Sequence, residues 1–275
     1  MLCCTLTPES RVSSKPRVCA VSYLNTLPLV WGMLHGPQRE CFDLEFGLPS
    51  ECADRLASGA ADIGLAPSIE MARQGMEFVP GTGIACHGAV RSILLVTKVP
   101  LEKIRTLAAD TSSRTSVALA RIILSRRYGA APRMAPHAPD LPAMLEAADA
   151  ALIIGDPALR VDPAQLPMAV YDLGAEWAEM TSLPMVFAVW SGRKEANPAG
   201  MEAAFVESCR FGRARIEEIA RREGPARSMS EALAQDYLER NIVNELGERE
   251  YEGLRLFIRY ARESDMLVTT GVAQA

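Results

Sequence analysis

Short apolar runs alternate with segments of helical periodicity along the first hundred residues. The run RVCAVSY at 17–23 predicts a strand, and the segment after it carries Leu29, Val30 and Met33 at helical spacing up to Gly36. Similar apolar runs predict strands at 42–46, 61–67, 78–85 and 92–98, with helices at 49–60 and after Ser68. Such alternation predicts a parallel or mixed sheet that is covered by helices on both faces.

A second set of units begins after Val99-Pro100, which interrupts the first pattern. It predicts strands at 106–109, 133–137, 150–154, 168–173 and 185–190, and helices at 141–148 and 176–181. A further helix should carry Val117, Ala120 and Leu124 and end near Gly129. Beyond Trp190 the pattern is helical. We expect one helix over 197–223, another after the capping-box spacing of Ser228 and Glu231, and a last one that carries Tyr251 and Leu254.

These breaks predict a two-lobed α/β protein. We expect a flexible extension over 1–16, a discontinuous first lobe of 17–98 and 191–275, and a second lobe of 99–190. Such proteins bind small ligands in the cleft between lobes, where strand ends and helix starts face each other. Polar residues fall at these positions in both halves: Ser22, Asn25, Ser68, the cluster at 112–115, and Asp156.

The segment DTSSRT at 110–115 joins a predicted strand to a predicted helix. The first turn of a helix has unpaired N–H groups and a partial positive charge, so added hydroxyls make a seat for a carboxylate or phosphate. One Ser, Thr or Asp is enough to cap a helix, whereas five such residues stand here within six positions. We therefore expect an anion site, with simple capping as the alternative.

Composition excludes several functions. The net charge of −5 argues against a nucleic-acid surface, and no apolar run is long enough to span a membrane. The seven cysteines form no CxxC pair, which argues against a disulfide framework or a metal site. The first fifteen residues lack the features of a signal peptide, so we expect a cytoplasmic protein. No motif indicates a cofactor or an obligate protein partner.

Several blocks of sequence resemble one enzyme family. They are VSYLNTLPL at 21–29, DIGLAPSIE at 62–70, RSILLVTK at 91–98, DTSSRTSVALA at 110–120, LIIGDPAL at 152–159, LPMVFAVW at 183–190 and YLERNI at 237–242. In this order they resemble the chorismate dehydratases of the futalosine route to menaquinone, the menaquinone biosynthesis enzyme A family. The likeness extends from Val18 to about Met266 and implies a periplasmic-binding-protein type II fold.

The resemblance implies the elimination of water from chorismate to give 3-[(1-carboxyvinyl)oxy]benzoate, with no redox cofactor. It makes Asn25 and Ser92 the catalytic residues. In the family, the enolpyruvyl carboxylate of the substrate is thought to accept the ring proton. The expected substrate-binding residues are Ser22, Ser68, Arg91, Thr111, Ser112, Ser113, Thr115 and Asp156.

Other interpretations remain open at this point. Asn25 could cap the helix at Pro28, Ser92 could be structural at a strand start, and Asp156 before Pro157 is a common helix-capping pair. A solute-binding protein would share the fold but carry a secretory signal. The sister enzyme 1,4-dihydroxy-6-naphthoate synthase would differ in the SYLNT block, and the effector domain of a regulator would follow a helix-turn-helix segment.

Overall fold

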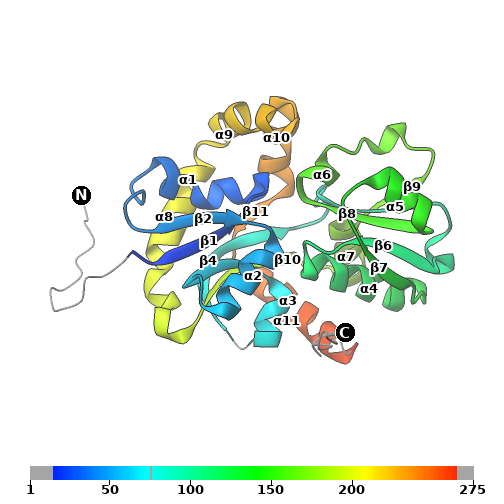
Figure 1. Cartoon of the computed structure of the whole chain (residues 1–275), viewed down its shortest axis with the longest axis horizontal. Coiled ribbons are helices and arrows are strands. Elements are labelled where there is room, and N and C mark those ends of the chain that lie inside the picture. The colour runs from blue at the N-terminus through cyan, green and yellow to red at the C-terminus, as the bar shows by residue number, and fades with distance from the viewer. Residues whose placement is uncertain (1–14, 75, 265–275) are drawn as a thin grey trace.

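Two β-sheets, each covered by helices, lie side by side in the computed structural model (Figure 1), which describes residues 15–74 and 76–264. The predicted two-lobed α/β architecture is therefore confirmed. Of the expected extension over 1–16, only Lys15 and Pro16 lie within the described residues. The carbonyl of Pro16 accepts a hydrogen bond from Asp43 N at 3.0 Å, which joins this residue to the first sheet.

The first lobe is built on a six-stranded sheet in the order β11-β4-β10-β3-β1-β2. Strands β1, β2 and β3 are parallel, while β10 runs antiparallel to β3 and β4 on either side. The strands are β1 (Arg17–Val21), β2 (Asp43–Gly47), β3 (Ile63–Pro67), β4 (Glu77–Cys86), β10 (Met185–Gly192) and β11 (Val243–Glu245). Its helices are α1 (Leu27–His35), α2 (Pro49–Ser58), α3 (Ser68–Gln74), α8 (Glu202–Arg213), α9 (Ile216–Glu223), α10 (Glu231–Asp236) and α11 (Glu248–Glu263).

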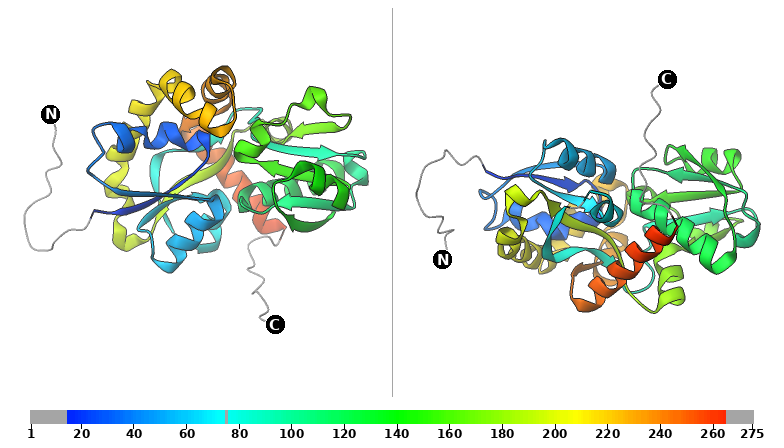
Figure 2. Two further views of the ribbon diagram at one scale, coloured as in Figure 1. Left: turned by 45° about the horizontal axis from the view of Figure 1, so that its top comes forward. Right: turned by 90° about the horizontal axis from the view of Figure 1, so that it is seen from below.

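The second lobe is built on a five-stranded sheet in the order β7-β6-β8-β5-β9. Its strands are β5 (Ile93–Thr97), β6 (Thr106–Asp110), β7 (Arg133–His137), β8 (Ala150–Ile154) and β9 (Ala169–Asp172). Its helices are α4 (Arg114–Tyr128), α5 (Leu141–Ala147), α6 (Gly155–Leu159) and α7 (Leu173–Thr181). Helix α11 packs on β10 of the first lobe and also contacts α4 of the second (Figure 2).

The chain crosses between lobes at 87–92 and at 182–184, which differs from the expected boundaries. Strand β5 pairs with β8 and β9 and so belongs to the second lobe, whereas β10 inserts between β3 and β4 of the first. Val99-Pro100 marks an ordinary turn after β5. The apolar pattern predicts that a strand is buried, but it does not indicate which sheet the strand joins.

The helical tail also differs in detail from the prediction. The helix expected over 197–223 is interrupted, because Arg215 leaves the helical conformation between α8 and α9 (φ −132°). The N-cap of α10 is Ser230, whose side chain accepts a hydrogen bond from Leu233 N, rather than Ser228. Ser228 itself adopts a left-handed conformation (φ 58°). Across the described part of the chain, no helix combines the length and apolar character needed to cross a bilayer.

Candidate active site

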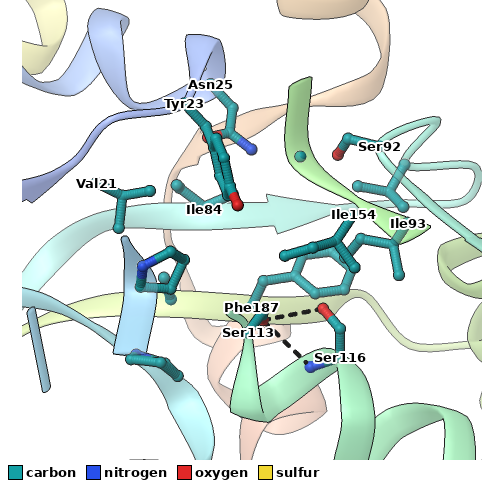
Figure 3. Close-up of a pocket in the computed structure, with 15 residues that line it drawn as sticks. Val21, Tyr23, Asn25, Ile84, Ser92, Ile93, Ser113, Ser116, Ile154 and Phe187 are labelled. Carbon is teal, nitrogen blue, oxygen red and sulfur yellow. Dashed lines mark hydrogen bonds between the residues drawn. The ribbon is translucent and has the colours of Figure 1, made fainter. Parts of the chain in front are cut away.

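A cavity lies between the lobes and contains about 470 Å³ of space, part of it open to solvent (Figure 3). Residues of β1, β4 and β10 line it from the first lobe, and residues of β5, β8 and the start of α4 line it from the second. Its apolar walls include Val21, Ile84, Ile93, Ile154 and Phe187.

The polar groups of the cavity are one amide and several hydroxyls, which belong to Asn25, Tyr23, Ser92, Ser113 and Ser116 (Figure 3). Among the fifteen described residues that line the cavity, only Tyr23 has an acidic or basic side chain. Burial raises the pKa of the Tyr23 phenol to about 12, which keeps it neutral near pH 7. The cavity wall therefore carries hydrogen-bonding groups but no full charge at that pH.

Helix α4 begins at the cavity with two serines. Ser113 is its N-cap, and the Ser113 hydroxyl accepts a hydrogen bond from Ser116 N at 3.3 Å. The two hydroxyls are 3.0 Å apart, and both residues line the cavity (Figure 3). Ser113 therefore both caps the helix and lines the cavity. The unpaired N–H groups of this first turn and the two hydroxyls suit a carboxylate.

Asn25 lies in the 3₁₀ turn Leu24–Thr26 that precedes α1. The structure shows no capping bond from its side chain, because its Nδ2 donates instead to the hydroxyl of Tyr237 at 2.9 Å. Asn25 Oδ1 is buried without a hydrogen-bond partner in the described structure. A buried acceptor left unpaired is costly, so this oxygen is available to a ligand donor.

Ser92 stands at the first crossing between lobes, directly before β5. It is buried, and its backbone carbonyl accepts a hydrogen bond from Gly155 N at 2.8 Å. Its hydroxyl oxygen accepts a hydrogen bond from the Tyr237 hydroxyl, also at 2.8 Å. The two residues expected to be catalytic, Asn25 and Ser92, therefore contact the same phenol and both line the cavity.

Three of the expected binding residues join the lobes beside the cavity without lining it. The Ser112 hydroxyl is 3.1 Å from that of Tyr23, and the Ser112 carbonyl accepts from Ser50 N. The hydroxyl of Thr115 accepts from Ile69 N at 3.3 Å. Asp156 accepts from Leu24 N at 3.0 Å, and its other oxygen is 3.3 Å from Arg227 Nε.

Four other expected binding residues do not line the cavity. The side chain of Ser68 is fully buried and donates to the carbonyl of Val186 at 2.8 Å. Ser22 and Thr111 are exposed. Arg91 is exposed in a left-handed conformation (φ 61°), where its backbone N–H donates to Asp172 at 2.5 Å. Each lies in a matched sequence block, but proximity in sequence to a cavity residue does not direct a side chain into the cavity.

The sequence prediction missed three polar residues, namely Tyr23, Ser116 and Tyr237. Ser116 could have been predicted from the sequence, because the third residue after an N-cap lies on the same side of the helix start as the cap. Tyr23 sits in the SYLNT block, and the ring is pressed against Gly155, where an added Cβ would approach it to 2.6 Å. Nothing in its spacing marks Tyr237, which reaches Ser92 across 145 positions.

Comparison with solved structures supports the fold. A protein from Archaeoglobus fulgidus superposes with a TM-score of 0.72 at 16% identity, covering 93% of this chain and 100% of that one. The periplasmic aliphatic sulphonate binding protein of Escherichia coli gives a TM-score of 0.63 at 14% identity, covering 92% and 88%. At these identities the likeness shows a binding-protein type II architecture and no more.

Comparison of sequences is more specific. A chorismate dehydratase of Thermus thermophilus is 32% identical over 253 residues, which cover 86% of this chain and 91% of that protein. A chorismate dehydratase of Campylobacter jejuni is 30% identical over 178 residues, covering 62% and 65%. Residues 16–263 match the profile of a family described as menaquinone biosynthesis. With this match over most of its length, the chain belongs to the menaquinone biosynthesis family.

Proposed function

We propose that this member of the family is a hydro-lyase that eliminates water from chorismate to give 3-[(1-carboxyvinyl)oxy]benzoate. The named relatives support this activity. We further propose that the reaction belongs to the futalosine route and takes place in the cytoplasm. The free thiols of Cys19, Cys52, Cys86 and Cys209 are consistent with a reducing compartment.

The reaction is redox-neutral, which matches the groups that the cavity offers. Chorismate has two carboxylates, a ring hydroxyl and an acidic ring C–H. Loss of the ring proton and the hydroxyl as one molecule of water makes the ring aromatic, so no electron acceptor is required. The observation that carries the proposal is a cavity that combines apolar walls, an amide and hydroxyls at a helix start, without a charged side chain among its described lining residues.

That composition leaves the substrate to supply its own base. A protein base would have to be a carboxylate, an imidazole or an amine within hydrogen-bond reach of the ring proton. We propose that the enolpyruvyl carboxylate of chorismate accepts this proton and that the leaving hydroxyl takes it up as water. Apolar walls strengthen such internal electrostatic interactions, because they exclude bulk water.

The protein's own residues then have binding and stabilising roles. Ser113, Ser116 and the N–H groups of the first turn of α4 would hold one carboxylate. The Ser92 hydroxyl would donate to the departing hydroxyl. The second N–H of Asn25 Nδ2, which Tyr237 does not use, would donate to an oxygen on which negative charge grows. Groups of this kind stabilise the transition state more than the ground state when they are fixed beforehand.

Mixing the purified protein with chorismate alone tests the proposal. We expect the ultraviolet spectrum to develop the absorption of an aromatic product, with the product's mass lower than that of chorismate by one water. Activity should persist after treatment with a chelator and without nicotinamide or flavin. Binding of chorismate without any spectral change would instead indicate a solute-binding protein, the function that the fold alone permits.

A further inference from the structure

We propose that Tyr237 is a positioning residue that fixes Asn25 and directs the hydroxyl proton of Ser92 into the cavity. This inference rests on the proposed function for its catalytic consequence. Tyr237 begins the π-helical turn Tyr237–Asn241, which follows α10 in the first lobe. It is fully buried and does not line the cavity itself.

The phenol joins two segments that are far apart in sequence. Asn25 comes from the turn before α1, and Ser92 comes from the first crossing between lobes. Tyr237 lies 2.9 Å from Asn25 Nδ2 and 2.8 Å from Ser92 Oγ. A single hydroxyl thus connects both residues that the sequence resemblance makes catalytic.

The donors and acceptors of the three side chains set the direction of this row of hydrogen bonds. The Asn25 amide nitrogen can only donate, so the Tyr237 oxygen accepts there. The phenol has one proton, which it donates to Ser92 Oγ. The proton of Ser92 is therefore not used by Tyr237 and remains for a ligand in the cavity that Ser92 lines. Burial raises the pKa of the Tyr237 phenol, so the phenol keeps its proton at neutral pH.

Chains of hydrogen bonds polarise one another, so each donor in the row strengthens the next. Asn25 polarises the Tyr237 hydroxyl, which in turn makes Ser92 a better donor. A leaving hydroxyl gains negative charge as its bond to carbon breaks, and it benefits from this donor more than the intact substrate does. Tyr237 should therefore affect turnover more than substrate affinity.

Tyr237→Phe keeps the buried ring and removes only the hydroxyl. We expect kcat to fall by about 10- to 100-fold, as for loss of one hydrogen bond felt in the transition state, with KM changing less than about threefold. Tyr251→Phe is the matched control, since it removes a hydroxyl that accepts from Gly81 N at 2.8 Å in the same lobe and lies outside the cavity lining. Its kcat should stay within about twofold of wild type. An unchanged kcat in Tyr237→Phe would overturn the inference.

A double-mutant cycle separates positioning from general damage. If Tyr237 acts in part through Ser92, the loss of kcat in the double variant Ser92→Ala with Tyr237→Phe should be clearly smaller than the product of the two single losses. If the kcat losses of the two single variants multiply in the double variant, the two residues act independently, which would contradict the inference. Fluorotyrosine at position 237 is the second variant should Tyr237→Phe fail to fold, because it keeps the ring and hydroxyl. We expect kcat to differ between the fluorotyrosine variant and wild type, because the two phenols differ in acidity. An unchanged kcat would contradict the inference.

The contact between Tyr237 and Ser92 can also be tested without substrate, by measuring the free energies of unfolding of wild type, the two single variants and the double variant. Non-additive effects of Ser92→Ala and Tyr237→Phe would support the hydrogen bond, while additive effects would refute it. Failure of the wild-type protein to convert chorismate would refute the proposed function. The stability cycle would still decide whether Tyr237 holds Ser92.

Discussion

Asp156 of the second lobe accepts a hydrogen bond from the backbone N–H of Leu24 in the first lobe at 3.0 Å. Arg227, also of the first lobe, approaches the other carboxylate oxygen at 3.3 Å. The neighbours of this pair line the cavity, since Gly155 precedes Asp156 and Asn25 follows Leu24. The contact between the two lobes beside the cavity therefore includes one carboxyl group that can ionise.

Stability should depend on pH through Asp156. Burial raises the pKa of Asp156, against the opposing effects of Leu24 N–H and Arg227. Because the folded pKa exceeds the unfolded value of about 4, the folded state binds more protons between these two pKa values, and stability falls as pH rises through the folded pKa. Measured by urea unfolding from pH 4 to 7, the stability of wild type relative to Asp156→Asn should be greatest at low pH. A relative stability that increases with pH would show that the Arg227 pair dominates.

Arg114 should hold the lobes closed through charge. From the start of α4 it contacts Asp54 of α2 at 2.7 Å and Glu70 of α3 at 3.5 Å. Partly exposed ion pairs contribute about 0.2–1 kcal/mol each, so Arg114→Ala should raise KM about two- to tenfold with a smaller effect on kcat. Arg127→Ala is the control, because Arg127 is on the same helix but contacts Glu179 within the second lobe. Equal effects of the two substitutions would contradict a role in closure.

The serines at the start of α4 should determine substrate affinity. A hydrogen bond to a charged group contributes about 1.5–3 kcal/mol, so Ser113→Ala with Ser116→Ala should raise KM at least about tenfold. Ser112→Ala should have a smaller effect, since its hydroxyl contacts Tyr23 rather than lining the cavity. Steady-state kinetics of the double and single variants make the comparison. If Ser112→Ala were the more harmful, the carboxylate would have to bind elsewhere in the cleft.

Local patterns in the sequence were sufficient for most elements and for the position of the cleft. Apolar runs marked β5 within one residue and β10 within two residues of their observed bounds, because burial on both faces leaves a continuous apolar segment. The hydroxyl-rich segment before α4 was identified for a similar local reason. The sheet that β5 and β10 join was misassigned, since strand pairing is a long-range property.

The side chains of the site were less predictable for the same reason. Whether a serine near the cleft enters the cavity or joins the lobes depends on the segment opposite, as Ser113 and Thr115 show. For Asn25 the sequence left helix capping open as an alternative, whereas in the structure the hydroxyl of Tyr237, 212 positions away, accepts its amide proton. Contacts across such separations leave no spacing that a single sequence can reveal.

Asn25 should be required for turnover, and this is where an enzyme and a binding protein differ. Removing a donor that acts on growing negative charge typically costs 10²- to 10³-fold, so we expect about that loss of kcat in Asn25→Leu. Asn25→Asp should be at least as harmful although it has the same shape. Its carboxylate would accept the Tyr237 proton, turning the phenol away from Ser92, and would add a negative charge beside a dianionic substrate. Kinetics, chorismate affinity and melting temperature should be measured on the same three proteins. Normal turnover in Asn25→Leu, or a loss explained entirely by unfolding, would show that Asn25 is structural.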